Sequence, residues 1–104
     1  MIYSDLGKVM TIEVLDIRIL NGDRSLRAFA DVKINNWIIR EWRIIQEAGK
    51  RPLIVSPQVS WKNPAGNIQY KTIITVPDEI KGELDRIILN RYIEETEKRQ
   101  DARK

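Results

Sequence analysis

The sequence predicts an α+β fold, in which an antiparallel β-sheet of about five strands precedes a C-terminal α-helix. Three observations support this fold class. Apolar and polar residues alternate from Leu26 to Ile34, which is the period of a strand with one buried face. Turn residues flank that segment, with Asn21-Gly22-Asp23 before it and Asn35-Asn36 after it. From Ile80 onward the apolar spacing becomes that of an amphipathic helix.

The chain is long enough for one hydrophobic core and too short for two ordinary domains, so we expect a single domain over residues 1–104. Residues 1–8 show no periodic pattern and are expected to form an N-terminal extension, followed by the sheet over 9–76. The first strand begins at Val9, and its phase changes near Val14. Either a β-bulge shifts the phase or both faces of this strand are covered, and the sequence leaves both alternatives open.

The third strand, from Trp37 to Gln46, carries large apolar side chains on both faces. We therefore expect another part of the protein, or a second subunit, to pack against each face. The short run from Leu53 to Val55 lies between two prolines. Because proline cannot donate to a strand ladder, we expect this strand at a sheet edge. Gln58 to Asn67 is expected to be a loop that contains the turn residues Asn63-Pro64-Ala65-Gly66, and Tyr70 to Val76 is expected to be the last strand.

The C-terminal segment is predicted to be a helix over 77–97, because Pro77 suits a first helical turn. An apolar stripe that should cover the sheet follows it: Ile80, Leu84, Ile87, Ile88 and Tyr92. Leu89 and Ile93 lie nearly opposite Ile80, and exposing each would forgo roughly 1.5–3 kcal/mol. We therefore expect a homodimer with Leu89 and Ile93 at its interface. The highly charged residues 98–104 are expected to fray.

Composition limits the possible functions. The chain has no cysteine, which excludes disulfides and the usual structural zinc sites, and no histidine, which removes the commonest general base and metal ligand. We therefore expect no enzymatic activity, no metal, no cofactor and no small-molecule substrate. No apolar run reaches the roughly 18 residues that span a bilayer, and residues 1–10 lack a secretion signal. The expected location is the cytoplasm, in association with the nucleoid and not with a membrane.

The positive charge is distributed unevenly. The segment from Ala48 to Pro77 contains no acidic residue, and its cations are Lys50, Arg51, Lys62 and Lys71. Such a segment is typical of a surface that binds a polyanion. Trp61 precedes Lys62, and Tyr70 precedes Lys71, so aromatic rings could stack on bases while the cations meet phosphates. The alternative is that Trp61 packs inward as the plug of a long loop.

Two other groups of cations need an interpretation. The strands carry Arg18, Arg27, Lys33, Arg40 and Arg43, and we favour cross-strand pairing of these with Asp16, Asp31 and Glu41. The outward face of the helix is mainly acidic and should repel DNA. Arg91 lies within the apolar stripe, so that it either pairs beneath the helix or emerges at a subunit boundary.

The order and spacing of several segments resemble those of the stage V sporulation protein G family, the small bacterial septation regulators. The resemblance covers about Ile12 to Glu94 and rests on these segments: Ile12-Glu-Val-Leu-Asp-Ile-Arg18, Asn21-Gly-Asp23, Leu26-Arg-Ala28, Trp37 to Ile45, Pro57, Pro64-Ala-Gly66 and Leu84 to Tyr92. It implies a homodimeric, cytoplasmic DNA-binding regulator of septation, sporulation or transcription, with RNA as an additional ligand and without enzymatic activity or cofactor.

The resemblance also suggests site residues. The family usually carries a Ser-Lys-Arg segment after the proline equivalent to Pro57, whereas this chain reads Gln58-Val-Ser-Trp-Lys62, so that only Lys62 carries over as a cation. The family's helix is associated with target choice, and the cations at comparable places here are Lys81, Arg86 and Arg91. The candidate nucleic-acid-binding residues are therefore Lys50, Arg51, Trp61, Lys62, Lys71, Lys81, Arg86 and Arg91.

One alternative function comes from a different class. The chain could be a protein-interaction module of the cell-division machinery, which recruits a protein partner through the two-sided helix and the edge strand near Leu53 to Val55. Binding of that kind would survive high salt, whereas binding driven by phosphates would weaken by orders of magnitude.

Overall fold

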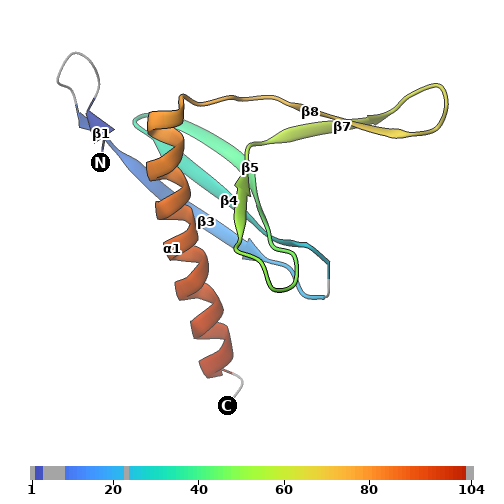
Figure 1. Cartoon of the computed structure of the whole chain (residues 1–104). Coiled ribbons are helices and arrows are strands. Elements are labelled where there is room, and N and C mark those ends of the chain that lie inside the picture. Colours follow the sequence, from blue (N-terminus) through green and yellow to red (C-terminus); the bar gives the residue numbers. More distant parts are fainter. Residues whose placement is uncertain (1, 4–8, 23, 103–104) are drawn as a thin grey trace.

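The computed structural model describes residues 2–3, 9–22 and 24–102, and it confirms the predicted α+β class. The main sheet is antiparallel with the strand order β3-β4-β5-β6. Its strands are β3 (Ile12–Ile19), β4 (Leu26–Ile34), β5 (Trp37–Ile45) and β6 (Leu53–Val55). Helix α1 (Asp78–Ala102) lies across one face of this sheet (Figure 1). Among the described residues, no helix has the length and apolar character needed to cross a membrane.

Two short pairs of strands complete the described fold. β1 (Ile2–Tyr3) pairs with β2 (Val9–Met10), so β1 lies within the predicted extension, of which residues 1 and 4–8 are outside the described part. β7 (Gln58–Lys62) pairs with β8 (Ile68–Thr72) in a hairpin that projects away from the main sheet (Figure 1). The main sheet therefore has four strands in place of the five expected, because the strand predicted over Tyr70 to Val76 is present only as β8, which ends at Thr72 and belongs to this separate hairpin.

The first three strands of the main sheet, β3, β4 and β5, run up, down and up, as the turn residues predict. Ile34 lies opposite Trp37 across a two-residue turn, and Asn35 adopts a φ of 54° there. Asparagine tolerates this left-handed conformation better than most residues do. Its side-chain oxygen also accepts a hydrogen bond of 3.1 Å from the Thr11 backbone N–H. The turn is therefore tied to the start of the adjacent strand.

Bulges explain the imperfect alternation of β3 and β5. The register of β3 shifts between Val14 and Asp16, which confirms the first of the two alternatives for that strand. A second shift in β5 lies between Ile39 and Trp42, where Glu41 has a φ of 66°. This bulge returns Ile39 and Trp42 to the same face, so both can pack under one cover. A second cover is therefore not needed to account for these two side chains.

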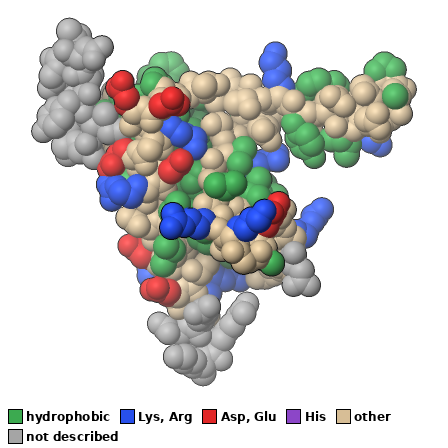
Figure 2. Space-filling model, viewed as in Figure 1, with side chains coloured by type: hydrophobic (Ala, Val, Ile, Leu, Met, Phe, Trp, Pro, Cys, Tyr) green, Lys and Arg blue, Asp and Glu red, His purple; other side chains and the backbone are tan. Residues whose placement is uncertain are grey.

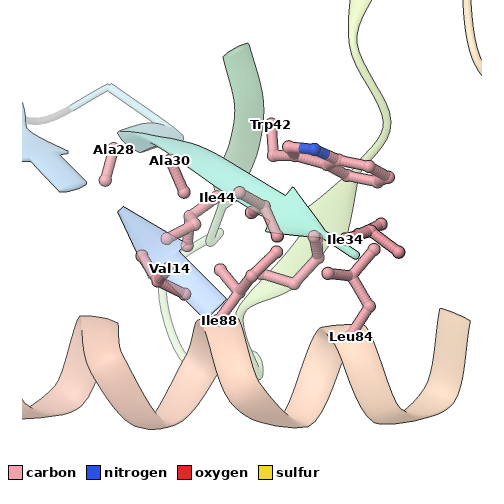
Figure 3. Close-up of a cluster of buried hydrophobic side chains, with 10 residues drawn as sticks. Val14, Ala28, Ala30, Ile34, Trp42, Ile44, Leu84 and Ile88 are labelled. Atoms are coloured by element: carbon pink, nitrogen blue, oxygen red, sulfur yellow. The ribbon is translucent and has the colours of Figure 1, made fainter. Parts of the chain in front are cut away.

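The core lies between the main sheet and α1 (Figure 3). Leu84 and Ile88 point from the helix toward the sheet, and both are fully buried. Ala28 and Ala30 on β4 are also fully buried, and their small side chains leave room for the bulkier Trp42 and Ile44 of β5 in the same cluster. Burying a large aliphatic side chain stabilises the fold by roughly 1.5–3 kcal/mol. The predicted stripe of α1 thus covers the sheet as expected.

The segment predicted as a loop is instead the hairpin. The Asn63 N–H donates to Asn67 O at 2.9 Å, and the Gly66 N–H donates to Asn63 O at 2.9 Å, with Gly66 at a φ of 86°. The residues on both sides of this turn pair as strands, so the loop expected over Gln58 to Asn67 is wrong for Gln58–Lys62. Apolar and polar residues alternate in both strands, from Gln58 to Lys62 and from Ile68 to Thr72, but neither strand has a buried face.

The helix continues to Ala102, beyond the predicted end at residue 97. Lys98 lies 3.7 Å from Glu95, and the Arg99 guanidinium donates to Asn21 Oδ1 at 2.8 Å. Fraying is expected in this charged end of the helix, but Lys98 and Arg99 both have partners there. Residues 103–104 of the predicted frayed tail lie outside the described part.

The two residues expected at a dimer interface differ in their surroundings. Leu89 is partly buried and packs against the core of its own chain. Ile93 is 48% exposed. Of the two, Ile93 is thus the one that remains open to a second subunit.

Candidate nucleic-acid interface

The β7–β8 hairpin brings together the aromatic and basic residues predicted from the acid-free segment. Ser60 lies opposite Tyr70, and Val59 lies opposite Lys71. Because successive side chains of a strand point to opposite faces, Trp61 and Lys71 share one face of the hairpin, and Lys62 and Tyr70 share the other. Each face therefore combines one aromatic ring with one ammonium group.

Both aromatic rings are accessible. Trp61 is 48% exposed and Tyr70 is 57% exposed, so the alternative in which Trp61 plugs a loop is wrong. Other large apolar side chains of the same arm are also exposed, namely Val59, Ile68 and Ile73. Figure 2 shows hydrophobic and basic side chains on the projecting arm, whereas acidic side chains gather over α1. The hairpin thus presents apolar rings in a region of positive charge.

The cations of the acid-free segment are mostly unpaired. The ion pairs among the described residues do not involve Arg51, Lys62 or Lys71. Lys50 lies 3.0 Å from Glu47, and both side chains are well exposed. An exposed pair of this kind contributes about 0–1 kcal/mol, so a phosphate could replace the carboxylate at little cost.

The helix cations are held by carboxylates of the same helix. Lys81 Nζ lies 2.6 Å from Asp85 Oδ1 and donates to the Ile54 carbonyl at 2.9 Å. Arg86 pairs with Glu83 and, through that contact, lowers the pKa of Glu83 to about 2.

Arg91 is held in the same way. Its Nε lies 2.9 Å from Glu95 Oε1, and its Nη1 donates to the Val14 carbonyl at 3.4 Å. Arg91 also holds the pKa of the Glu95 carboxyl below its usual value. This geometry answers the question left open by the sequence, because Arg91 pairs within its own chain. Lys81 and Arg91 therefore have partners on their own chain, whereas Arg86 keeps a side chain that is 58% exposed in its pair with Glu83.

The cations of the sheet pair around one carboxylate. Asp31 accepts hydrogen bonds from Arg18 Nη1 at 2.9 Å, from Arg40 Nη1 at 3.0 Å and from the Glu41 backbone N–H at 3.2 Å. Chiefly because of Arg18, the pKa of Asp31 is lowered, and the contact with Asp31 raises the pKa of Arg18 in turn. The predicted pairing is therefore confirmed for Arg18 and Arg40.

A cavity of about 390 Å³ lies where the base of the hairpin meets the start of β4 and the end of β5. It is lined by polar and basic residues with an apolar pair among them: Arg24, Ser25, Arg43, Gln58, Tyr70, Leu26 and Ile45. The sequence interpretation missed Arg24 and assigned Arg43 to the pairing group. Neither residue carries a local signal, because only the position of the hairpin against the sheet brings them beside Tyr70.

Within the described part of the chain, no group of three or more acidic side chains is arranged to hold a metal ion. The side chains of the candidate interface are aromatic rings, cations and hydrogen-bonding groups, which suit reversible binding of an anion.

Searches with protein-family models and against curated protein sequences give no match to this chain. The family resemblance of its sequence accordingly stays a prediction.

Proposed function

We propose that this chain is a nucleic-acid-binding regulatory protein and that the β7–β8 hairpin is its main contact surface. The observation that carries the proposal is the exposure of Trp61 and Tyr70, at 48% and 57%, on an arm without a single acidic residue. An aromatic ring that packs as part of the hydrophobic core would be buried. An aromatic ring that stays accessible beside cations is suited to a base or a sugar.

Two kinds of contact act together in this proposal. Lys62, Lys71 and Arg51 neutralise phosphates and release counterions, which makes binding dependent on salt. Trp61 and Tyr70 stack on bases, and each stacked base contributes roughly 1–3 kcal/mol. Every base can stack on an aromatic ring, so the cations and rings should bind nucleic acid with little preference for its sequence.

The resemblance to the stage V sporulation protein G family supports DNA as the partner, RNA as a second ligand and a regulatory role in septation, sporulation or transcription. It also supports a homodimer and a location at the nucleoid. A few phosphate contacts from one chain bind weakly, whereas two linked copies let their contacts act on the same molecule. The exposed Ile93 favours the same assembly.

The test is a salt titration of binding to DNA and to RNA with the Lys62→Ala variant. Loss of one phosphate contact should reduce the slope of log K against log salt concentration by about 0.7–0.9. The matched control is Lys98→Ala, which removes an exposed cation near the C-terminal end of α1 and should leave the slope unchanged.

An unchanged slope for Lys62→Ala would remove that residue from the interface. If the wild-type chain bound neither DNA nor RNA at low salt, the proposal itself would fail. The alternative, a module that recruits a division protein through the two-sided helix and the edge strand near Leu53 to Val55, would then gain support from binding that survives high salt.

A further inference from the structure

The cavity at the base of the hairpin is basic and contains no carboxylate. Arg24 and Arg43 both line it, and neither is among the ion pairs of the described residues. Arg43 instead lies over Phe29, with 6.0 Å between its guanidinium carbon and the ring centroid. A pair of guanidinium groups with no carboxylate partner is suited to a phosphate, whose oxygens match their fork of N–H donors.

The other walls of the cavity indicate a ligand larger than a phosphate. The volume of about 390 Å³ falls within the range of small-molecule sites. Tyr70 offers an aromatic face, and Leu26 and Ile45 offer apolar contacts, which a phosphate alone would leave unused. Ser25 and Gln58 add hydroxyl and amide groups that can bond a base edge or a sugar. The combination fits one nucleotide, with its phosphate at the arginines and its base against Tyr70.

The cavity also continues along the hairpin. Gln58 and Tyr70, which line it, share their face of the ribbon with Ser60 and Lys62. At about 3.3 Å per residue, Lys62 stands roughly 13 Å from Gln58 along the strand. A stacked strand of nucleic acid advances about 3.4 Å per nucleotide, so about four nucleotides reach from the cavity to Lys62.

We propose that this cavity binds one unpaired nucleotide of a single-stranded nucleic acid, and that the hairpin face from Tyr70 to Lys62 holds the nucleotides that follow. The inference rests on the proposed function and narrows its partner to single strands. A base in a duplex is stacked and paired, so it can enter a cavity of this size only after it leaves the helix. A single strand meets no such barrier, which makes it the preferred ligand.

The test measures fluorescence anisotropy of the full chain with oligothymidine of about 12 nucleotides and with a duplex of equal length. The wild-type chain should bind the single strand about tenfold or more tightly than the duplex. Tyr70→Ala should weaken binding of the single strand by about 5- to 150-fold and leave the salt slope unchanged, because stacking carries no charge.

Arg24→Gln should lower that salt slope by about 0.7, since it removes one phosphate contact. Lys98→Gln is the matched control and should behave like the wild type. Tyr70 and Arg24 are both exposed, so the variants should keep the circular dichroism spectrum and thermal unfolding of the wild type. Tyr70→Leu repeats the stacking test with an apolar side chain retained, in case Tyr70→Ala disturbs the hairpin.

Three outcomes would overturn the inference while the proposed function stands: equal affinity for duplex and single strand, Tyr70 and Arg24 variants that match Lys98→Gln, or thymidine monophosphate binding as tightly as the oligomer. The last result would assign the cavity to a free nucleotide. Failure of the wild-type chain to bind any nucleic acid would instead reject the proposed function. The two failures are therefore distinguishable in one set of titrations.

Discussion

Asp31 is the buried charged side chain that Arg18, Arg40 and the β5 bulge all contact. It is 5% exposed and lies between the bulges of β3 and β5. Its carboxylate accepts the backbone N–H of Glu41, the residue whose positive φ makes the β5 bulge. A non-glycine residue in that conformation costs of order 1–3 kcal/mol, so the bulge persists only because its surroundings hold it. The contacts of Asp31 with Arg18, Arg40 and the Glu41 N–H help to stabilise the bulge.

Asp31→Asn should therefore destabilise the fold by about 2 kcal/mol. The amide keeps the shape of the side chain, but it loses the charge that Arg18 and Arg40 compensate. Asp16→Asn is the matched control, because Asp16 bonds the same Arg18 and is 57% exposed, so its loss should cost about 0–1 kcal/mol. Urea unfolding of both variants measures the difference. Equal losses would show that burial of Asp31 adds nothing.

The same carboxylate predicts a pH dependence. The pKa of Asp31 is lowered in the folded state from an ordinary value of 3.8. The ionised group therefore stabilises the fold fully above that ordinary value, and this contribution is lost as the pH falls through the folded-state pKa. Unfolding measured from about pH 7 to about pH 2 should show the gap between wild type and Asp31→Asn close only on the acid side. A gap of constant size would argue that ionisation of Asp31 is not its cause.

Contacts between residues on neighbouring strands could be predicted from the sequence, whereas contacts between distant elements could not. The pairing of Arg18 and Arg40 with Asp31 followed from neighbouring strands, whose register the turns determine. The cavity residues Arg24 and Arg43 were beyond prediction as a site, because they meet Tyr70 only through the placement of the hairpin. Local pattern thus identified the cross-strand ion pairs, and tertiary placement determined the cavity.

At the level of elements, the strands with one buried face were predicted well. The alternation of β4 gave its bounds, because Ala28, Ala30, Val32 and Ile34 all face the core. The residues of β7 and β8 also alternate, but both strands are short and have no buried face, and the turn residues between them favoured a loop. These turn residues were visible, but the pairing that they join was not.

Replacing a glycine by alanine is expected to have opposite effects on stability in α1 and in the hairpin turn. A Cβ built on Gly82 meets nothing within 4 Å, and Gly82 lies in an exposed part of the helix. Gly82→Ala should therefore stabilise the chain by about 1 kcal/mol through helix propensity. Gly66 has equal space but a φ of 86°, so Gly66→Ala should strain the turn and destabilise the hairpin.

Chemical denaturation measures the first variant, and amide exchange in β7 and β8 measures the second. If Gly82→Ala were destabilising, α1 would need the glycine for a contact beyond the described chain.

For the whole molecule, the packing of the helix on the sheet follows from the amphipathic patterns of the sequence, whereas the oligomeric state does not. The stripe of α1 was predicted to cover the sheet, and Leu84 and Ile88 do so. The same geometry put Leu89 and Ile93 on an opposite face, yet Leu89 packs against its own core. A helix that lies across a twisted sheet is covered over more of its circumference than a narrow stripe suggests. Only Ile93 of this pair is left with a large exposed surface.

Ile93 therefore gives a direct test of the proposed homodimer. Ile93→Glu should convert a dimer into a single chain of 12.2 kDa, because it places a charge in an apolar contact. Ile93→Val is the matched control, since it keeps the contact apolar and should remain dimeric. Both variants should fold, because Ile93 is 48% exposed in the single chain. Light scattering after size-exclusion chromatography measures the mass, and a wild-type chain at 12.2 kDa would reject the dimer.

Assembly and binding are linked if two hairpins act on one nucleic acid. The monomeric variant should then bind a long probe at least roughly 100-fold more weakly, because the second contact is no longer intramolecular. On a probe too short to reach both hairpins, Ile93→Glu and wild type should bind alike, since each protomer keeps its own Trp61, Tyr70 and lysines. An equal loss on both probes would place Ile93 within the binding surface itself. A difference that grows with probe length would show that the dimer brings two hairpins to one strand.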